Sequence, residues 1–498
     1  MSLRIAATNA GTGLTANTRL AEIVSRNMAN ATNEGYAARS LSLTARIMAG
    51  EGSGVQVGGP TRAGDPMLTM DRRKADARAA LDNATSNALA KLSGLLVPGN
   101  GGEALSEKFA ALDNALRGLE AAPESASNQF LALNAAKNVA SALNHVGDEA
   151  ARMRIAADAD IALQVAKLNE TLEGVDRLNI EIRKGAAAGL DVTALQDERD
   201  RQLNVLNAIV PIRAVSRADG GVTIYTQGGA VLMDPTAVKV DFRATPMFGG
   251  AETLENGALS GLTLRGLDAT PTGSPASSLL AGGTLEAAFR TRDRMIPEFT
   301  AQVDALAADL LNRFGDLGLD GQLFIDAHDP AALNVSGAQQ IGLASRIAVN
   351  PAVDPAQGGE VWRMRDGMTA AVPSALAADA TLIRAMVDAF AEQRPVQQPV
   401  NPNPLNGIWA LPAFSGSQSA MQLAEGFASV RENAAARAQE TATFSRAAQS
   451  TMRDAEMRLT AVDTDAELRA ILAIEKAYAA NARVLQVVDE MLKRILEM

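Results

Sequence analysis

The two ends of the chain carry the same pattern of apolar residues. At the N-terminal end, apolar or small residues recur at alternating spacings of four and three, interrupted by one asparagine. This heptad spacing is typical of a helix that packs along one face against another helix. The N-terminal row consists of Leu3, Ala7, Ala10, Leu14, Asn17, Ala21, Val24 and Met28.

The C-terminal end repeats this pattern, again with one asparagine. Each segment would form a rod about 40 Å long at about 1.5 Å per residue. The two helices could be ordinary core helices, or they could pair as a coiled coil and pack into a larger assembly. Because neither buries much alone, we expect both to be mobile in the monomer and ordered by partners. The C-terminal row consists of Ile471, Ile474, Tyr478, Asn481, Leu485, Val488, Leu492 and Ile495.

An asparagine-rich segment, NMANATNEGY, follows the first of these predicted helices. Asn30, Asn33 and Gly35 predict the end of the helix, because Asn and Gly tolerate the left-handed conformation that a helix end requires. Alternating apolar residues over 41–47, a glycine-rich turn over 50–54 and the sequence VQVGG come next. This succession predicts a β-hairpin.

Helices are also predicted over much of the middle of the chain, and Asp463 is the predicted N-cap of the last one. Residues 209–281 are predicted to be β-rich, with a hairpin turn at 217–221. Residues 331–390 show no single pattern, and residues 394–407 contain four prolines, which predicts a loop or linker. The further predicted helices cover residues 66–98, 103–208, 284–314 and about 418–460.

These patterns predict a fold that is mainly α with inserted β-rich domains. Long terminal helices would form a coiled-coil-like axial domain, joined to a helical stem that carries outer excursion domains. The expected division is a terminal-helix axial domain (1–33 with 464–498), a stem with an N-terminal hairpin (34–208, 284–330 and 415–463), a β-rich insertion (209–283) and a mixed excursion with a proline-rich linker (331–414).

Composition narrows the class of protein. A net charge of −11 argues against nucleic acid as a main partner, since phosphate binding needs clustered Lys and Arg. No apolar run of membrane-spanning length occurs. The first 20 residues lack the apolar block of a secretory signal peptide. We therefore expect a protein that stays in the cytoplasm or leaves it by a route that reads no cleavable signal.

The sequence offers few candidates for catalysis, and we expect no enzyme, cofactor or metal site. The stretch GTGLTA (11–16) resembles a dinucleotide motif, but no strand precedes it and it lies within the N-terminal row. The histidines, His145 and His328, are far apart in the sequence, which does not indicate a shared metal site. Trp362 and Trp409 are interpreted as local core anchors rather than ligand platforms.

Two clusters mix positive and negative side chains. One spans residues 197–200 and the other residues 292–294. Mixed signs favour ion pairs between helices or subunits over paired catalytic carboxylates. For residues 197–200 we expect a solvated helix face rather than a metal site.

The two ends together resemble the bacterial flagellar axial proteins, which include rod, hook and first hook-associated proteins. A helix followed by N-x-A-N-x-x-x-x-G-Y is found here with Asn27, Asn30, Gly35 and Tyr36. The end of the chain, EKAYAANARVLQVVDEMLKRILEM, is similar to the end of the same group.

Two internal blocks narrow the resemblance to the FlgK family of hook–filament junction proteins. The first is LQDERDRQL followed by a strand, and the second is GGTLEAAFRTRDRMIPEF. Rod and hook proteins lack these blocks, so a hook or rod protein is the closest alternative and only the two blocks decide against it. The residues that carry the resemblance are Asp197, Arg199, Asp200, Gly283, Leu285, Arg292, Asp293 and Pro297.

The resemblance implies a structural subunit of the flagellum that joins hook to filament by axial self-assembly. It also implies a ring or tube of identical subunits, contacts with hook protein and with a second junction protein toward the filament, and a cytoplasmic export chaperone on the C-terminal helix. Export would follow the flagellar type III pathway to the extracellular junction. A secreted adhesin or hydrolase on a helical stalk is a further alternative, which would require a pocket within 331–414.

Overall fold

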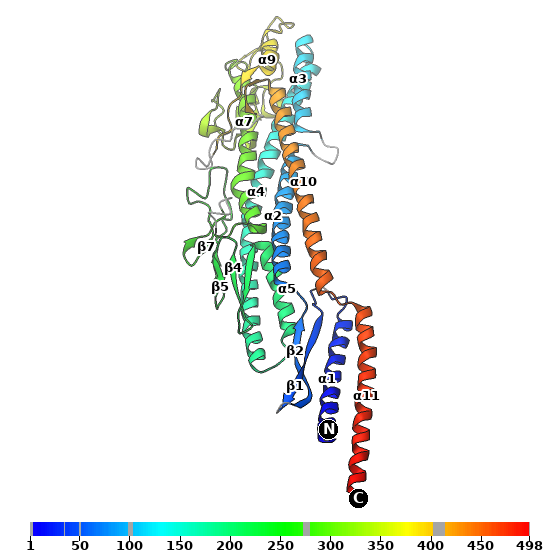
Figure 1. Ribbon diagram of the computed structural model, residues 1–498. Coiled ribbons are helices and arrows are strands. Elements are labelled where there is room, and N and C mark those ends of the chain that lie inside the picture. The colour runs from blue at the N-terminus through cyan, green and yellow to red at the C-terminus, as the bar shows by residue number, and fades with distance from the viewer. Residues whose placement is uncertain are drawn as a thin grey trace. The chain divides into compact units, whose positions relative to one another are not determined.

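Helices dominate the computed structural model, which describes residues 3–33, 35–48, 51–97, 103–271, 279–401 and 414–497 (Figure 1). The mainly α fold class is confirmed. Pro123 and the left-handed Gly189 (φ +72°) divide the helical stretch predicted over 103–208 into three helices. The long helices are α1 (Leu3–Ala29), α2 (Pro66–Leu96), α3 (Leu105–Ala121), α4 (Ala126–Ala187), α5 (Thr193–Ile209), α7 (Ile296–Gly315), α10 (Ala420–Thr460) and α11 (Thr464–Leu496).

The predicted β-hairpin follows α1. Strands β1 (Arg39–Met48) and β2 (Glu51–Arg62) pair antiparallel with two register shifts. Gly52 lies opposite Ile47 in β2, so most of the turn predicted over 50–54 belongs to the strand. At the other end of the chain, the Asp463 carboxylate accepts hydrogen bonds from the backbone N–H groups of Asp465 and Ala466, which confirms the predicted N-cap of α11.

The region predicted to be β-rich forms two small antiparallel sheets. Strands β3 (Ile212–Ser216), β4 (Val222–Thr226) and β5 (Val231–Met233) make the first, and residues 217–221 form its turn as predicted. The second sheet holds three two-residue strands, β6 (Val240–Asp241), β7 (Thr263–Leu264) and β8 (Leu267–Asp268).

The helix predicted over 284–314 is interrupted by one π-helical turn. It consists of α6 (Gly283–Arg290), the π-helix Thr291–Met295 and α7 (Ile296–Gly315). Beyond it the chain forms short elements, in the region where the sequence shows no single pattern. They are β9 (Phe324–Asp326), four 3₁₀ turns (Gly337–Gln340, Leu343–Ser345, Pro351–Val353 and Pro355–Gln357), β10 (Ile347–Val349), α8 (Arg363–Asp366), α9 (Thr381–Ala391), β11 (Arg394–Pro395) and β12 (Ser417–Gln418).

The chain forms two compact units. The first comprises Met1–Ala79, Lys167–Lys239 and Ser445–Met498, and the second comprises Ala80–Ala166 and Val240–Phe444. The structure thus assigns the two small sheets to different units. The four-part division expected from the sequence stays a prediction.

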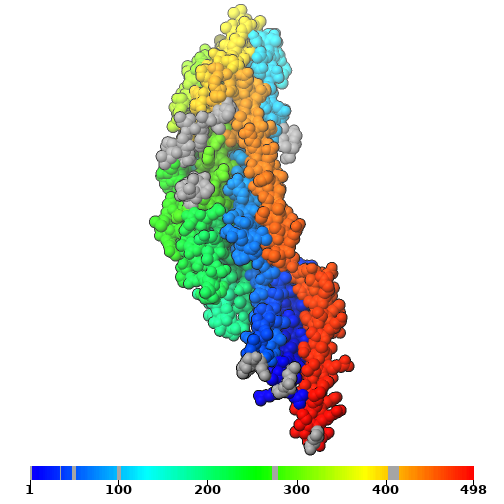
Figure 2. All heavy atoms as spheres, in the orientation of Figure 1, coloured from blue at the N-terminus to red at the C-terminus, as the bar shows by residue number. Residues whose placement is uncertain are grey.

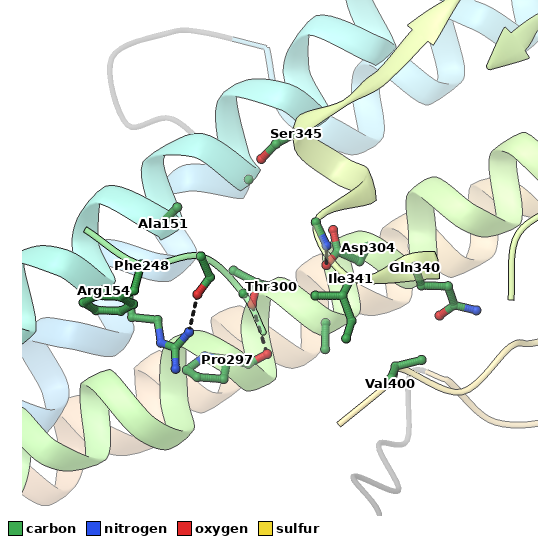
Figure 3. Close-up of a pocket in the computed structure, with 15 residues that line it drawn as sticks. Ala151, Arg154, Phe248, Pro297, Thr300, Asp304, Gln340, Ile341, Ser345 and Val400 are labelled. Carbon is green, nitrogen blue, oxygen red and sulfur yellow. Dashed lines mark hydrogen bonds between the residues drawn. The ribbon is translucent and has the colours of Figure 1, made fainter. Parts of the chain in front are cut away.

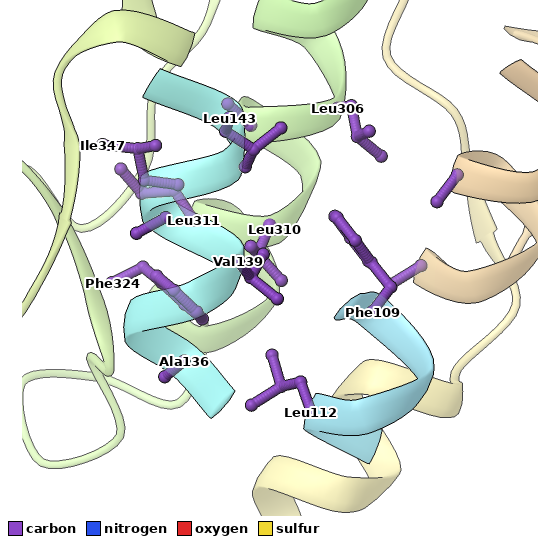
Figure 4. Close-up of a cluster of buried hydrophobic side chains, with 14 of the residues drawn as sticks. Phe109, Leu112, Ala136, Val139, Leu143, Leu306, Leu310, Leu311, Phe324 and Ile347 are labelled. Atoms are coloured by element: carbon purple, nitrogen blue, oxygen red, sulfur yellow. The ribbon is translucent and has the colours of Figure 1, made fainter. Parts of the chain in front are cut away.

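The largest hydrophobic core lies in the second unit, where side chains from α3, α4 and α7 meet (Figure 4). Phe109 of α3, Val139 of α4 and Leu310 of α7 are fully buried within it. Leu285 and Phe299, two residues of the second family block, are also fully buried in this unit. The block therefore forms part of the folded interior.

Candidate assembly site

The terminal helices of the first unit form an antiparallel pair (Figure 1). Helix α1 packs against α11 on one side and against the β-hairpin on the other. Its covered residues include Ala10, Ile23 and Val24, whereas Val488 is the one residue of α11 that is buried. Helix α11 is thus open along most of its surface, as Figure 2 shows.

The predicted rows are only partly covered by this pairing. On α1, Ala10, Asn17 and Val24 are buried, Leu3, Ala7, Leu14 and Met28 are half-buried, and Ala21 is exposed. On α11, Val488 is buried, Ile474, Asn481 and Leu485 are half-buried, and Ile471, Tyr478, Leu492 and Ile495 are exposed. The assembly role of the exposed members stays a prediction.

A second apolar row lies on α11, which the sequence reasoning missed. Its members are exposed in the described chain and recur at spacings of seven, four, three and four, the spacing of a helix-packing face. The same periodicity search that found the C-terminal row, started one position earlier, reveals it. We call it the outer stripe, and it consists of Ala473, Ala480, Val484, Val487 and Met491.

The two row asparagines differ in environment. Asn17 is 9% exposed, and its Nδ2 atom has no hydrogen-bond partner among the described residues. Asn481 is half-buried and lies beside Gly13, where an added Cβ would come within 2.8 Å of its Nδ2 atom. Gly13 of the GTGLTA stretch therefore allows close helix approach, which gives that stretch a packing role.

The family motif that ends α1 forms a hydrogen-bonded cluster at the root of the pair, which is the end where α1 finishes and α11 begins. Asn27 is buried, and its Oδ1 atom accepts hydrogen bonds from the Tyr36 hydroxyl (2.8 Å) and the Arg39 backbone N–H (3.0 Å). The Arg39 guanidinium lies 4.7 Å from the Tyr36 ring centre. Burial raises the pKa of Tyr36, and the positive charge of Arg39 opposes that rise. The hydroxyl therefore remains a donor to Asn27.

Two further motif residues shape the turn after α1. The Asn30 Nδ2 atom donates to the Arg26 carbonyl (2.9 Å). Gly35 adopts φ +79°, a conformation that residues with a side chain rarely take. The motif is therefore structural in its local role: it ends a helix and directs the chain into β1.

The cluster at 197–200 forms buried ion pairs, so the expected solvated face was wrong. Asp197 is 4% exposed and pairs with Arg39 (3.0 Å) and Arg62 (2.7 Å) of the hairpin. Asp200 pairs with Arg62 (2.8 Å) and with Arg73 of α2 (3.2 Å). The hairpin and α2 cover this face of α5, and opposite charges on both sides permit its burial.

Arg199, in the same cluster, contacts α4 and the first small sheet instead of the hairpin. Its guanidinium donates to Asn179 Oδ1 of α4 (3.2 Å) and to the Gly220 carbonyl in the turn between β3 and β4 (2.8 Å). The LQDERDRQL block thus joins the hairpin, α4 and the first small sheet. This set of contacts suits a structural role.

In the second unit, the other mixed cluster surrounds Arg292. This side chain is fully buried and pairs with Asp158 (2.6 Å) and Asp293 (2.7 Å). Its guanidinium also lies beside two rings, 5.8 Å from the centre of Phe242 and 4.8 Å from the centre of Phe289. The π-helical turn Thr291–Met295 carries Arg292, and the left-handed Gly283 (φ +67°) and Pro297 lie at the starts of α6 and α7.

A cavity of about 240 Å³ also lies in the second unit (Figure 3). Burial raises the pKa of its Asp304 to about 7, although the carboxylate accepts hydrogen bonds from the N–H groups of Gly342 (2.7 Å) and Ala344 (2.8 Å). Arg154 is held by backbone carbonyls, including that of Gly249 (2.8 Å). Among the described lining residues there is no nucleophile paired with a base.

Among the described residues, no group of three or more His, Cys, Asp or Glu side chains is arranged to hold a metal ion. His145 and His328 are both exposed. Trp362 is half-buried, whereas Trp409 lies outside the described residues. Among the helices that the structure describes, none is long and apolar enough to cross a membrane.

Comparison with known proteins matches two parts of the chain to flagellar families. A model described as the flagellar hook-associated protein FlgK helical domain matches residues 89–323. A model of the C-terminal region of flagellar basal body rod FlgEFG proteins matches residues 459–498. Together with the paired terminal helices, these matches define a flagellar axial protein.

The more specific of the two models decides the family. Residues 89–323 belong to the FlgK family of flagellar hook-associated proteins, which confirms the resemblance carried by the two internal blocks within them. Flagellar hook-associated protein 1 of Bacillus subtilis is 24% identical over 220 residues, which cover 42% of this chain and 43% of that protein. The match thus spans less than half the length of this relative.

A solved structure was also compared. The flagellar hook junction protein FlgK from Burkholderia pseudomallei gives a TM-score of 0.49 at 12% identity, over 79% of this chain and 100% of that one.

Proposed function

We propose that this protein is a structural subunit of the hook–filament junction that assembles axially with its own copies through α1 and α11. One observation carries the proposal. Helix α11 places one apolar row partly against α1 and leaves a second, the outer stripe, open to solvent. An open apolar row at helix-packing spacing favours a further helical partner.

The energetics suit an assembly rather than a tight dimer. Val484, Val487 and Met491 are each 43–48% exposed. Burying the exposed half of such a side chain contributes about 1 kcal/mol. A few such contacts per neighbour are weak alone but add up when each subunit contacts several others around a ring or tube.

The family supports the remaining parts of the proposal. The subunit would contact hook protein on one side and a second junction protein on the other. A cytoplasmic chaperone would cover the exposed apolar surface of α11 until type III export to the extracellular junction. A structural role, without catalysis, accords with the structural relatives of the family.

A charge placed in the outer stripe tests the proposal. Val487→Glu puts a carboxylate on the stripe, whereas the control Gln486→Glu puts one on an exposed neighbouring position. In the purified monomer both variants should match the wild-type melting curve. In cells that carry the variant in place of the wild-type protein, Val487→Glu should abolish attached filaments and swimming, and Gln486→Glu should not. Normal filaments with Val487→Glu would contradict the proposal.

A further inference from the structure

We infer that Asn27 is the residue that positions the terminal-helix pair, so that α11 meets neighbouring subunits in one register. The inference rests on the proposed function and deepens it, because it assigns the residue that sets the height of the outer stripe. It starts from the contact between the last turn of α1 and the first turn of α11. There the Asn27 Nδ2 atom donates to Glu467 Oε1 over 2.6 Å.

Every hydrogen-bonding position of the Asn27 amide is occupied. Its Nδ2 atom donates to the Arg39 carbonyl (2.9 Å) as well as to Glu467, and its Oδ1 atom accepts from Tyr36 and from the Arg39 N–H. The side chain is 1% exposed. One amide therefore joins α1, the base of the hairpin and α11, and no other side chain of that size offers two donors and two acceptors in this arrangement.

A second contact gives the same alignment. Asn27 and Gly13 are two heptads apart on α1, and Glu467 and Asn481 are two heptads apart on α11. Asn481 lies directly against Gly13, so both contacts fit one antiparallel register. Carried through the layers between these two contacts, the register would pair Val24 with Ala470, Leu20 with Ile474 and Asn17 with Ala477.

The apolar layers alone select this register weakly. Ala470 and Ala477 are one heptad apart and present the same small side chain, so Val24 fits against either. The shift of one heptad that brings Val24 opposite Ala477 would place Asn27 opposite Ile474 and leave one donor of Asn27 without a partner. Polar contacts therefore distinguish the native register from its neighbours.

Register has a direct consequence for the surface that α11 offers. Extended to the end of the pair, the same register would bring Leu3 level with Met491, and Figure 1 shows the C-terminal end of α11 extending past the start of α1. Displacement of α11 along α1 would move the outer stripe and this free end together. A neighbouring subunit that recognises both would then lose part of its contact.

Cysteine cross-linking can measure this register. The chain contains no cysteine of its own, so two introduced cysteines have no competing thiol in the same chain. The full-length protein is prepared with Val24→Cys and Ala470→Cys, and the rate of disulfide formation is measured under mild oxidation. Asn27→Asp is then added, which keeps both acceptor contacts but places a carboxylate against Glu467. The double change Asn27→Asp with Glu467→Lys restores an attractive pair.

We expect Asn27→Asp to slow cross-linking about tenfold or more and Glu467→Lys to restore most of the rate in the double variant. Glu467→Gln keeps the acceptor oxygen and should match wild type, whereas Glu467→Leu should behave like Asn27→Asp. Glu467→Leu also serves as the test if Asn27→Asp fails to fold. Junction assembly, scored as attached filaments, should follow the cross-linking rates across the series.

A merely structural role for Asn27 gives a different pattern. In that case Asn27→Asp would lower the melting temperature with the cross-linking rate unchanged, and Glu467→Lys would restore nothing; this result would overturn the inference. The cross-linking readout is independent of assembly. If Val487→Glu and every Asn27 variant assemble normally while cross-linking follows the expected series, the proposed function fails and the positioning role stands.

Discussion

Arg292 and Asp158 form an ion pair of 2.6 Å in which the two side chains are 0% and 1% exposed. Removal of one partner from such a pair leaves a buried charge without full compensation. We expect Asp158→Ala to lower the free energy of unfolding of the second unit by about 3 kcal/mol. Trp362 lies in this unit, so denaturant unfolding followed by tryptophan fluorescence measures the effect.

Arg152→Ala is the control for this measurement, since Arg152 pairs with Glu149 on the surface and should contribute less than about 1 kcal/mol. Combining Asp158→Leu with Arg292→Met should cost less than Asp158→Ala alone, because both fully buried charges are removed and Asp293, the other partner of Arg292, is partly exposed. A double variant less stable than the single one would contradict this account.

Leu285 tests the packing of the second family block. Its side chain is fully buried, so Leu285→Ala should cost roughly 2–5 kcal/mol from lost burial and the cavity left behind. Leu163 of α4 is 70% exposed in the same unit, and Leu163→Ala should cost less than about 0.5 kcal/mol. Equal unfolding curves for the two variants would show that Leu285 is not packed as described.

Asp304 should make the second unit less stable as the pH rises. Its pKa is raised from 3.8 to about 7, so the folded state favours the protonated form. The resulting stabilisation is complete below about pH 4 and is lost as pH rises through about 7. Between pH 5 and 8 the wild type should therefore lose about 2–3 kcal/mol relative to Asp304→Asn.

Urea unfolding of both proteins at several pH values measures this difference. Asp329→Asn, at an exposed position in the same unit, should follow the wild type. A constant difference between wild type and Asp304→Asn across this range would show that Asp304 titrates normally.

Asn17 allows a test of the polar position in the N-terminal row. Because its buried Nδ2 atom has no partner among the described residues, Asn17→Leu should stabilise the terminal pair and raise self-association of the isolated protein. The same change removes a polar register signal and should reduce correct junction assembly. Thr18→Leu, at an exposed position, is the control, and sedimentation together with filament counts gives the readout.

Hydrogen exchange of the free monomer tests the expected mobility of the chain ends. Helix α11 buries a single residue, whereas most of α7 is buried. Amides of α11 should therefore exchange much faster than those of α7. Equal protection of the two helices in a verified monomer would contradict the proposal that assembly orders the ends.

Local patterns in the sequence predicted the elements that depend on neighbouring residues. The heptad rows, the alternation after Gly35 and the N-cap at Asp463 each need only a few adjacent positions. The same patterns did not predict which residues of α1 face α11. On α1, Gly13 lies against Asn481, and Leu20 is half-buried whereas Ala21 of the predicted row is exposed, because adjacent small and apolar residues fit both rows.

Long-range contacts explain what the sequence did not predict. The burial of Asp197 depends on Arg39 and Arg62, which lie more than a hundred residues earlier in the chain. The role of Asn27 likewise depends on Glu467, at the other end of the sequence. No local spacing indicates such pairs, although a family motif marks Asn27 and Asp197 as positions to examine.

Both terminal helices are rooted at the same end of their pair, where the Ala38 N–H donates to the Thr460 carbonyl over 2.8 Å. A sideways pull on the free end of α11 therefore separates the helices progressively from that end, one layer at a time. The layers near the free end are small or half-exposed, whereas the root holds the Asn27–Glu467 contact. The pair yields first at its tip and last at its root, so a subunit strained by a rotating flagellum can lose contact at the tip and re-form it from an intact base.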